Sequence, residues 1–206
     1  MSPDRLVAEE IRAALRPVNL GFEVVVLEST ESTNDVVREM AAAGPVREGL
    51  VVFAEHQTAG RGQRGNRWES IPYKGLYFSI LLRPDLDVRD SGQLTRWGAQ
   101  GVADTIQGFC ELEAAVKPPN DIYVGARKVG GVLVEMRAQP QARHNAIVGV
   151  GLNVNQQLPD FPKELQERAT SLAIETKKPV ERQRLAVALL RNLDRTYRAL
   201  FRSGAD

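Results

Sequence analysis

The sequence has few of the residues that build disulfides, zinc sites or membrane spans. Cys110 is the only cysteine, and His56 and His144 are the only histidines, in a chain of 206 residues. A disulfide within the chain is therefore excluded, and no Cys/His spacing of the zinc type occurs. The first residues mix charged and apolar side chains, unlike a secretory signal, and no run approaches the ~20 apolar residues of a membrane span. We expect a cytoplasmic protein in which Cys110 is a small core residue.

A large excess of either charge is also lacking. The chain carries 27 basic and 26 acidic residues, for a net charge of +1. A dedicated nucleic-acid binder usually shows a clear basic excess, so we expect any cationic site to be local. No repeat, low-complexity tract or linker marks a domain boundary. The sequence therefore predicts a single domain over residues 1–206.

Hydrophobic periodicity predicts clustered strands with helices between and after them. Strands are expected at 22–28, 50–56, 75–84 and 146–155, with a hairpin of 122–124 and 129–135 around Gly125-Ala126. Helices are expected at 6–15, from Ser32 or Thr33 to Gly44, at 92–109 and at the C-terminal end, with Ser32 or Thr33 capping the second helix. This order favours an α+β domain: a mixed, largely antiparallel sheet with helices packed on one face.

The stretch AGRGQRGNRW, residues 59–68, is the most unusual local feature. Its glycines allow positive φ and close approach of the backbone to a ligand, and its arginines offer forked donors to carboxylate or phosphate groups. The spacing is not that of a Walker loop. From these residues alone, an exposed turn, a short RNA contact and a site for an anionic small molecule all remain open.

Three further stretches contain polar residues, and two of them also contain glycines. They are Ser32-Thr33-Asn34, KPPNDIYVGARKVGGVLVE at 117–135, and VGVGLNVN at 148–155. The first fits a helix cap or a site for a polar ring. In the second, Asn120-Asp121 fits a plain turn, Lys128 fits a solvated side chain or a ligand-binding cation, and the Gly130-Gly131 pair indicates close approach of a ligand or another backbone.

Taken together, ESTND, EHQTAGRGQRGNRW, KPPNDIYVGARKVGGVLVE and VGVGLNVN resemble the catalytic domain of the biotin protein ligases. These are also called biotin–[acetyl-CoA-carboxylase] ligases and belong to the biotin/lipoate ligase family. The likeness runs from about Leu27 to Asn155 and continues weakly through 169–172 into the last helix. It implies a class II-synthetase-like fold and a reaction in which biotin and ATP give biotinyl-5′-AMP and pyrophosphate. A lysine of a biotin carboxyl carrier protein domain then takes the biotinyl group.

The resemblance also assigns cofactors, partners and residue roles. It implies ATP and Mg²⁺, with biotin as substrate and a carrier domain as partner; no DNA or membrane partner is expected, and a homodimer is left open. The implied catalytic residues are Lys128, Arg61 and Asp121. Asp121 either lies near magnesium or accepts a proton from the incoming lysine, and no metal ligand is assigned. The implied biotin site comprises Ser32, Thr33, Asn34, Gln57, Gly60, Arg61, Lys128, Gly131 and Gly149. The implied nucleotide site comprises Gln63, Arg64, Trp68, Asn120, Lys128 and Asn153.

The chain departs from the family pattern in places. Gln63 and Asn66 stand where arginines are common, and Pro118 replaces the tryptophan of the usual KWPND. Because glutamine lacks the charge of arginine, we expect a weaker hold on the adenylate. We expect neither the DNA-binding winged helix of some ligases nor the small C-terminal β-barrel of many relatives. The alternatives are a lipoate–protein ligase, whose RRxxGGGxVxHD-type motif is not found, and a non-catalytic biotin- or adenylate-binding module.

Overall fold

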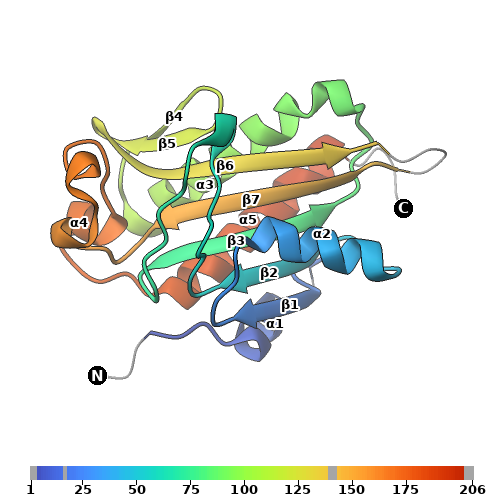
Figure 1. Ribbon diagram of the computed structural model, residues 1–206, viewed down its shortest axis with the longest axis horizontal. Helices are drawn as coiled ribbons and strands as arrows, with labels where there is room; N and C mark the ends of the chain where they lie inside the picture. Colours follow the sequence, from blue (N-terminus) through green and yellow to red (C-terminus); the bar gives the residue numbers. More distant parts are fainter. Residues whose placement is uncertain (1–3, 16–17, 139–142, 202–206) are drawn as a thin grey trace.

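A computed structural model describes residues 4–15, 18–138 and 143–201 and places one seven-stranded sheet at the centre (Figure 1). The strand order is β1-β2-β3-β7-β6-β5-β4. β1 pairs with β2 in parallel, and the other neighbouring strands pair antiparallel, which confirms the predicted mixed, largely antiparallel sheet. The strands are β1 Glu23–Leu27, β2 Leu50–Ala54, β3 Gly75–Leu82, β4 Ala114–Lys117, β5 Asp121–Val124, β6 Arg127–Arg137 and β7 Asn145–Asn153.

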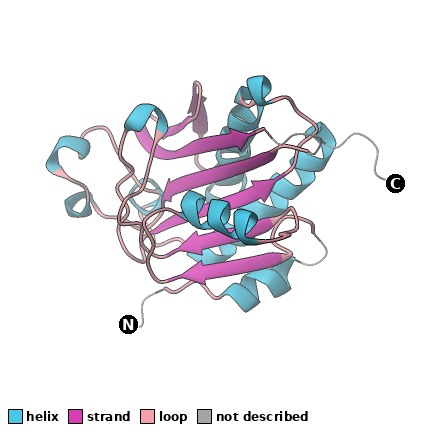
Figure 2. Cartoon of the chain, turned by 45° about the vertical axis from the view of Figure 1, so that its right-hand side comes forward, coloured by secondary structure: helices cyan, strands magenta, loops and turns pink. Residues whose placement is uncertain are grey.

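Helices cover both faces of the sheet, so the prediction that they pack on one face is wrong (Figure 2). α1 (Ala8–Leu15), α3 (Gly92–Cys110) and α5 (Arg182–Phe201) lie on one face, and α2 (Thr33–Ala43) lies on the other. β2 explains the second layer: Val51 and Phe53 join the main core, whereas Leu50 and Val52 pack beneath α2. A strand that is apolar on both faces needs cover on both. The remaining elements are α4 (Leu172–Thr176) and 3-10 turns at Gln63–Gly65, Val88–Asp90, Leu158–Asp160 and Lys163–Leu165.

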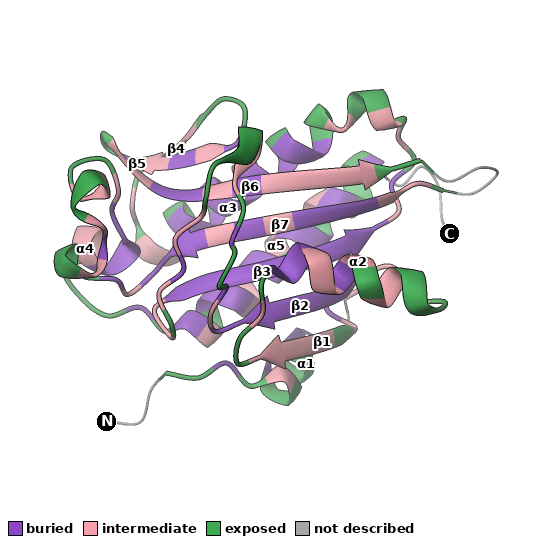
Figure 3. Cartoon of the chain, viewed as in Figure 1, coloured by how far each residue is buried: buried purple, intermediate pink, exposed green. Residues whose placement is uncertain are grey.

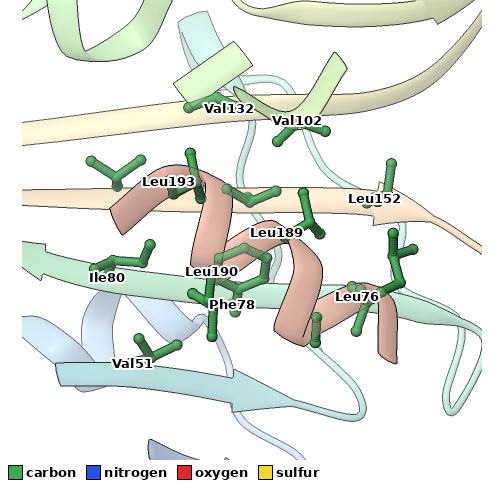
Figure 4. Packing of buried hydrophobic residues seen from close by; sticks show 14 of the residues in the cluster. Val51, Leu76, Phe78, Ile80, Val102, Val132, Leu152, Leu189, Leu190 and Leu193 are labelled. Carbon is green, nitrogen blue, oxygen red and sulfur yellow. The ribbon is translucent and has the colours of Figure 1, made fainter. Parts of the chain in front are cut away.

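The main core lies between the sheet and the α1, α3 and α5 layer. Figure 4 shows Leu190 of α5 beside Phe78 of β3, with Leu189 and Leu193 on the same helix. Each such side chain is fully buried, and burial of this kind contributes about 1.5–3 kcal/mol. Figure 3 shows the same pattern: the central strands are buried and the edge strands are partly exposed. Cys110 was predicted as a core residue; it is partly buried and packs against the edge of this core, and burial raises the pKa of its thiol. Within the described residues, no helix has the length and apolar character of a membrane span.

The opposite face of the sheet is only partly covered by α2. The segment between β2 and β3, residues 55–74, crosses in front of β3, β7 and β6 beside α2 (Figure 1). Its central part, residues 59–68, is a tight hairpin that we call the arginine loop. The Trp68 amide donates to the Gly60 carbonyl at 2.9 Å, and the Gly62 amide donates to the Asn66 carbonyl at 2.7 Å. Arg64 and Gly65 take positive φ at its tip.

Candidate functional site

A pocket of about 240 Å³ lies between the start of α2, the arginine loop and the β5–β6–β7 part of the sheet. The structure brings together most of the residues that the resemblance assigned to biotin, nucleotide and catalysis. Gly60 and Asn153 are the two that do not line this pocket. Those that do are Ser32, Thr33, Asn34, Gln57, Arg61, Gln63, Arg64, Trp68, Asn120, Asp121, Lys128, Gly131 and Gly149.

The polar residues at the start of α2 face this pocket instead of capping the helix. Ser32 occupies the N-cap position, but its side chain makes no capping hydrogen bond, so that prediction is wrong. The Thr33 amide and hydroxyl donate to the Gln57 side-chain oxygen at 2.8 and 3.1 Å. These two bonds orient the Gln57 side-chain amide, which lines the pocket.

Ser79 links these residues to the other side of the pocket and was not predicted. It is fully buried in β3, lies 2.7 Å from the Thr33 hydroxyl and donates to the Asn34 side-chain oxygen at 2.5 Å. The Asn34 amide in turn donates to a carboxylate oxygen of Glu135 at 2.7 Å. The sequence feature that could have indicated its role is a single serine inside the otherwise apolar strand GLYFSILL. A continuous polar network of this kind holds its members rigidly.

Arg61 ties the arginine loop to α2 and β6 through two carboxylates that were not predicted as partners. Its guanidinium donates to both oxygens of Asp35 at 2.5 and 2.8 Å and lies 3.5 Å from Glu135. Arg38 contacts the same two carboxylates. The hydrogen bond from Arg61 lowers the pKa of Asp35 below 3.8 and raises the pKa of Arg61. Both acidic partners thus engage the Arg61 guanidinium.

Replacing Asp35 with Asn will destabilise the protein in a pH-dependent way. Because the folded-state pKa of Asp35 is lowered, its ion pair contributes stability that is present above pH 3.8 and is lost as pH falls through the lowered pKa. The difference in unfolding free energy between wild type and Asp35→Asn should therefore be largest near pH 7 and vanish in acid, measured by urea denaturation. Asp104→Asn is the control, since the Asp104 carboxylate accepts a hydrogen bond from the Gln100 amide. A difference that is constant from pH 7 to pH 3 would contradict the assignment.

Lys128 lies at the back of the pocket, where β5 and β6 meet. Its ammonium is 2.6 Å from an Asp121 carboxylate oxygen and 5.7 Å from the centroid of the Trp68 ring. The side chains of Asp121 and Lys128 are each about one-third exposed, so an incoming anion can reach the lysine. Gly131 lies beside both groups.

A second pocket, of about 410 Å³, lies on the other side of Trp68 and Lys128. Both residues line the two pockets, so Lys128 stands at their junction. The indole Nε1 of Trp68 is buried and has no hydrogen-bond partner among the described residues. Asn153 lines this second pocket, but its amide donates to the Thr170 carbonyl at 3.0 Å and its oxygen accepts from Gln156 at 3.1 Å. Its predicted contact with adenine stays a prediction.

Three other predicted residues have packing partners in the structure. A Cβ at Gly149 would lie 2.4 Å from the Asn34 side-chain oxygen, and one at Gly60 would lie 2.6 Å from the Trp68 carbonyl. Gly149 thus makes room for Asn34, and Gly60 allows the arginine loop to close. The Asn120 amide donates to the Val132 carbonyl at 3.0 Å. The contacts of these residues with biotin or phosphate remain predictions.

Gly151, which was not predicted, makes room for the Trp68 indole, so Gly151→Ala is expected to displace that ring. A Cβ at this position would lie 2.5 Å from Trp68 Cε2, closer than real contacts allow. We expect a loss of about 1–3 kcal/mol of stability and a change in tryptophan fluorescence. The control is Gly108→Ala on α3, where nothing lies within 4 Å of the added Cβ and the substitution should stabilise the helix. Equal free energies of unfolding for Gly151→Ala and Gly108→Ala would show that the Trp68 ring can move aside without loss of stability.

Comparisons with known proteins place this geometry in context. Residues 26–153 match the family described as Biotin/lipoate A/B protein ligase. The chain is 34% identical over 196 residues to the bifunctional ligase/repressor BirA of Bacillus spizizenii, covering 95% of this chain and 60% of that protein. It is 35% identical over 173 residues to the biotin–[acetyl-CoA-carboxylase] ligase of Mycobacterium tuberculosis, covering 82% and 62%. The chain thus spans about 60% of the length of these curated relatives.

A solved structure shares the arrangement as well as the sequence pattern. It is the biotin protein ligase from Aquifex aeolicus in complex with biotin and ATP, with a TM-score of 0.73 and 30% identity. The similarity covers 87% of this chain and 73% of that one.

Proposed function

The chain belongs to the biotin/lipoate A/B protein ligase family, and we propose that it is a biotin–protein ligase. It uses ATP to convert biotin to biotinyl-5′-AMP and then transfers the biotinyl group to a lysine of a biotin carboxyl carrier protein domain. One observation carries the proposal most directly: the Lys128 ammonium stands where two neighbouring pockets meet. Two substrates that must react with each other need adjoining pockets with the reacting groups at the junction.

The chemistry requires two anions to approach each other. The biotin carboxylate attacks the α-phosphate of ATP, pyrophosphate leaves, and the carrier lysine later attacks the acyl carbon with AMP as leaving group. Lys128 at the junction lowers the repulsion between the two anions and stabilises the charge that develops at phosphorus. The Thr33–Gln57 pair at the other end of the first pocket suits the polar ureido ring of biotin, and such contacts reject analogues that lack those groups.

The charged residues of the site also fit magnesium brought in by the nucleotide. Among the described residues, no group of three metal-binding side chains occurs. Mg²⁺ in nucleotide sites usually needs only one or two carboxylates, because phosphates and water supply its other ligands. Asp121 is the carboxylate that would hold it, beside Lys128. When bound, the ion neutralises charge on the leaving pyrophosphate.

The names of the relatives favour biotin over lipoate as the acid. Both curated relatives described above carry ligase names, one of them a biotin ligase name, and the solved neighbour holds biotin. A carrier domain as acceptor is consistent with the name biotin–[acetyl-CoA-carboxylase] ligase. The absence of a DNA partner and the cytoplasmic location remain predictions.

Biotin-dependent exchange of labelled pyrophosphate into ATP tests the first step, and mass spectrometry of a carrier domain tests the second. We expect exchange and a biotin-sized mass increase only when biotin, ATP and magnesium are all present. Exchange with lipoic acid instead of biotin would favour a lipoate ligase. Biotin binding without exchange would favour a non-catalytic binding module.

Gln63→Arg should retain the adenylate longer than wild type. Gln63 lines the first pocket beside the implied adenylate position, and a charge-assisted hydrogen bond is stronger than a neutral one. We expect dissociation of biotinyl-5′-AMP to slow by roughly 3- to 30-fold, measured by chasing bound adenylate with unlabelled ligand. Gln93→Arg makes the same charge change outside this pocket and serves as the control. Equal dissociation rates for wild type and Gln63→Arg would contradict the prediction.

A further inference from the structure

Lys128 faces the pocket because β6 contains a bulge. Ile122 pairs with Gly130 and Tyr123 pairs with Lys128, so Val129 is an additional residue in β6. Side chains alternate faces along a regular strand, and an inserted residue shifts that alternation by one. Without the bulge, Lys128 would lie on the same face as Val132, which packs in the main core. With it, Val129 is buried in that core and Lys128 turns to the pocket.

A separate segment, residues 168–170, holds the backbone of Lys128 in this position. β7 pairs with β6 only as far as Leu152 with Gly130, so it does not reach Lys128. Instead, the Lys128 amide donates to the Arg168 carbonyl and the Thr170 amide donates to the Lys128 carbonyl, both at 2.8 Å. Both backbone polar groups of Lys128 are therefore fixed by a segment that lies far away in the sequence.

Glu175 of α4 ties this segment to the first residue of β6. One carboxylate oxygen of Glu175 accepts from the Thr170 hydroxyl at 2.5 Å and from the Arg127 guanidinium at 2.7 Å. Thr170 is fully buried, and Arg127 directly precedes Lys128. Figure 1 shows α4 beyond the end of the sheet where β6 begins and β7 ends. Neither Thr170 nor Glu175 lines either pocket.

We propose that Thr170 and Glu175 are positioning residues for Lys128, acting through the 168–170 segment and Arg127. The inference rests on the proposed function, in which Lys128 serves both substrates. A displacement of about 1 Å caused by a distant substitution can cost roughly 100-fold in rate. Because β7 ends before it reaches Lys128, the 168–170 segment supplies the backbone hydrogen bonds on that side of Lys128. Loss of this restraint affects the step at Lys128 more than it affects binding at the Thr33–Gln57 end of the pocket.

The test compares Thr170→Val, which removes only the hydroxyl, with Thr170→Ser, which keeps it. Glu175→Gln removes the charge of the ion pair and is a milder second variant. In pyrophosphate exchange, we expect Thr170→Val and Glu175→Gln to lower kcat by about 10- to 100-fold while the KM for biotin stays within about twofold, and Thr170→Ser to retain wild-type kcat. Thr176→Val is the matched control, since the Thr176 hydroxyl on the same helix bonds the Leu172 carbonyl. Its kcat should equal that of wild type.

A second readout does not depend on activity. Reductive ¹³C-methylation of the lysines keeps their charge, and the Lys128 methyl signal is identified by its loss in Lys128→Arg. We expect that NMR signal to shift in Thr170→Val and Glu175→Gln and to stay in place in Thr176→Val. The positioning role is overturned if Thr170→Val leaves both kcat and the Lys128 methyl signal unchanged, or if Thr176→Val lowers kcat as much as Thr170→Val does. Exchange by wild type would still uphold the proposed function. If wild type itself showed no exchange, the proposed function would fail, and the methyl signal alone would decide the positioning role.

Discussion

Lys128→Ala is expected to lower biotin-dependent pyrophosphate exchange and carrier biotinylation by at least about 10²- to 10³-fold, the cost of removing one preorganised charge-stabilising group. Lys128 lines both pockets, so its loss leaves the two anions without that cation at the position where they meet. Biotin binding should fall less than turnover, because the Thr33–Gln57 pair is untouched. Fluorescence titration with biotin and the exchange assay measure the two effects separately.

The variant should also fold, which makes its activity interpretable. The Lys128 and Asp121 side chains are about one-third exposed, so removing the lysine leaves no buried charge unpaired. Lys117→Ala is the matched control: the Lys117 ammonium lies 5.3 Å from the Tyr123 ring, and Lys117 lines neither of the two pockets that meet at Lys128. If Lys128→Ala exchanged pyrophosphate at the wild-type rate, Lys128 would not be the cation on which the reaction depends.

The elements and the pocket were predictable from sequence for different reasons. Strands such as 75–82 are apolar at nearly every position, so periodicity and turn residues marked them clearly. The pocket residues were predictable because four motifs resemble one family, not because any motif is specific by itself. Ser32 and Thr33 illustrate the difference: local preference predicts a helix cap, whereas the structure turns Thr33 toward Gln57.

The partners that hold the site together were not predictable, because they depend on strand order. Asp35 and Glu135 both contact Arg61 because α2 packs on β2, β3 and β7, and β7 pairs with β6. Their separation of a hundred residues carries no local signal. Thr170 bonds Glu175 within one short segment, but its link to Lys128 exists only once β7 has ended and the chain has returned beside β6. A pattern within one strand or helix contains no information on such contacts.

Arg182→Leu is expected to destabilise the protein by about 3–5 kcal/mol, because it leaves a buried carboxylate without its partner. Arg182 at the start of α5 is fully buried and donates to Glu55 at 2.7 Å and to the Gly75 carbonyl at 3.0 Å. Glu55 is only 2% exposed. The melting temperature should fall by roughly 6–20 °C, measured by calorimetry. Arg184→Ala on the same helix is the control: its side chain is 74% exposed and pairs with exposed Glu181, so its stability should stay within about 0.5 kcal/mol.

The same pair joins both ends of the 55–74 segment to α5, so its loss should also affect the site. Glu55 directly follows β2 and leads to Gln57, and Gly75 begins β3. In the double variant Glu55→Leu/Arg182→Leu, two apolar side chains replace the buried charges, and such replacements are often neutral or stabilising. We expect stability to recover substantially while the KM for biotin stays raised, because the segment carrying Gln57 has lost its polar anchor. A double variant with wild-type stability and wild-type KM would show that the ion pair is dispensable for both. One as unstable as Arg182→Leu would show that the bonds of this pair to the Gly75 carbonyl and the Leu6 amide matter more than the charges.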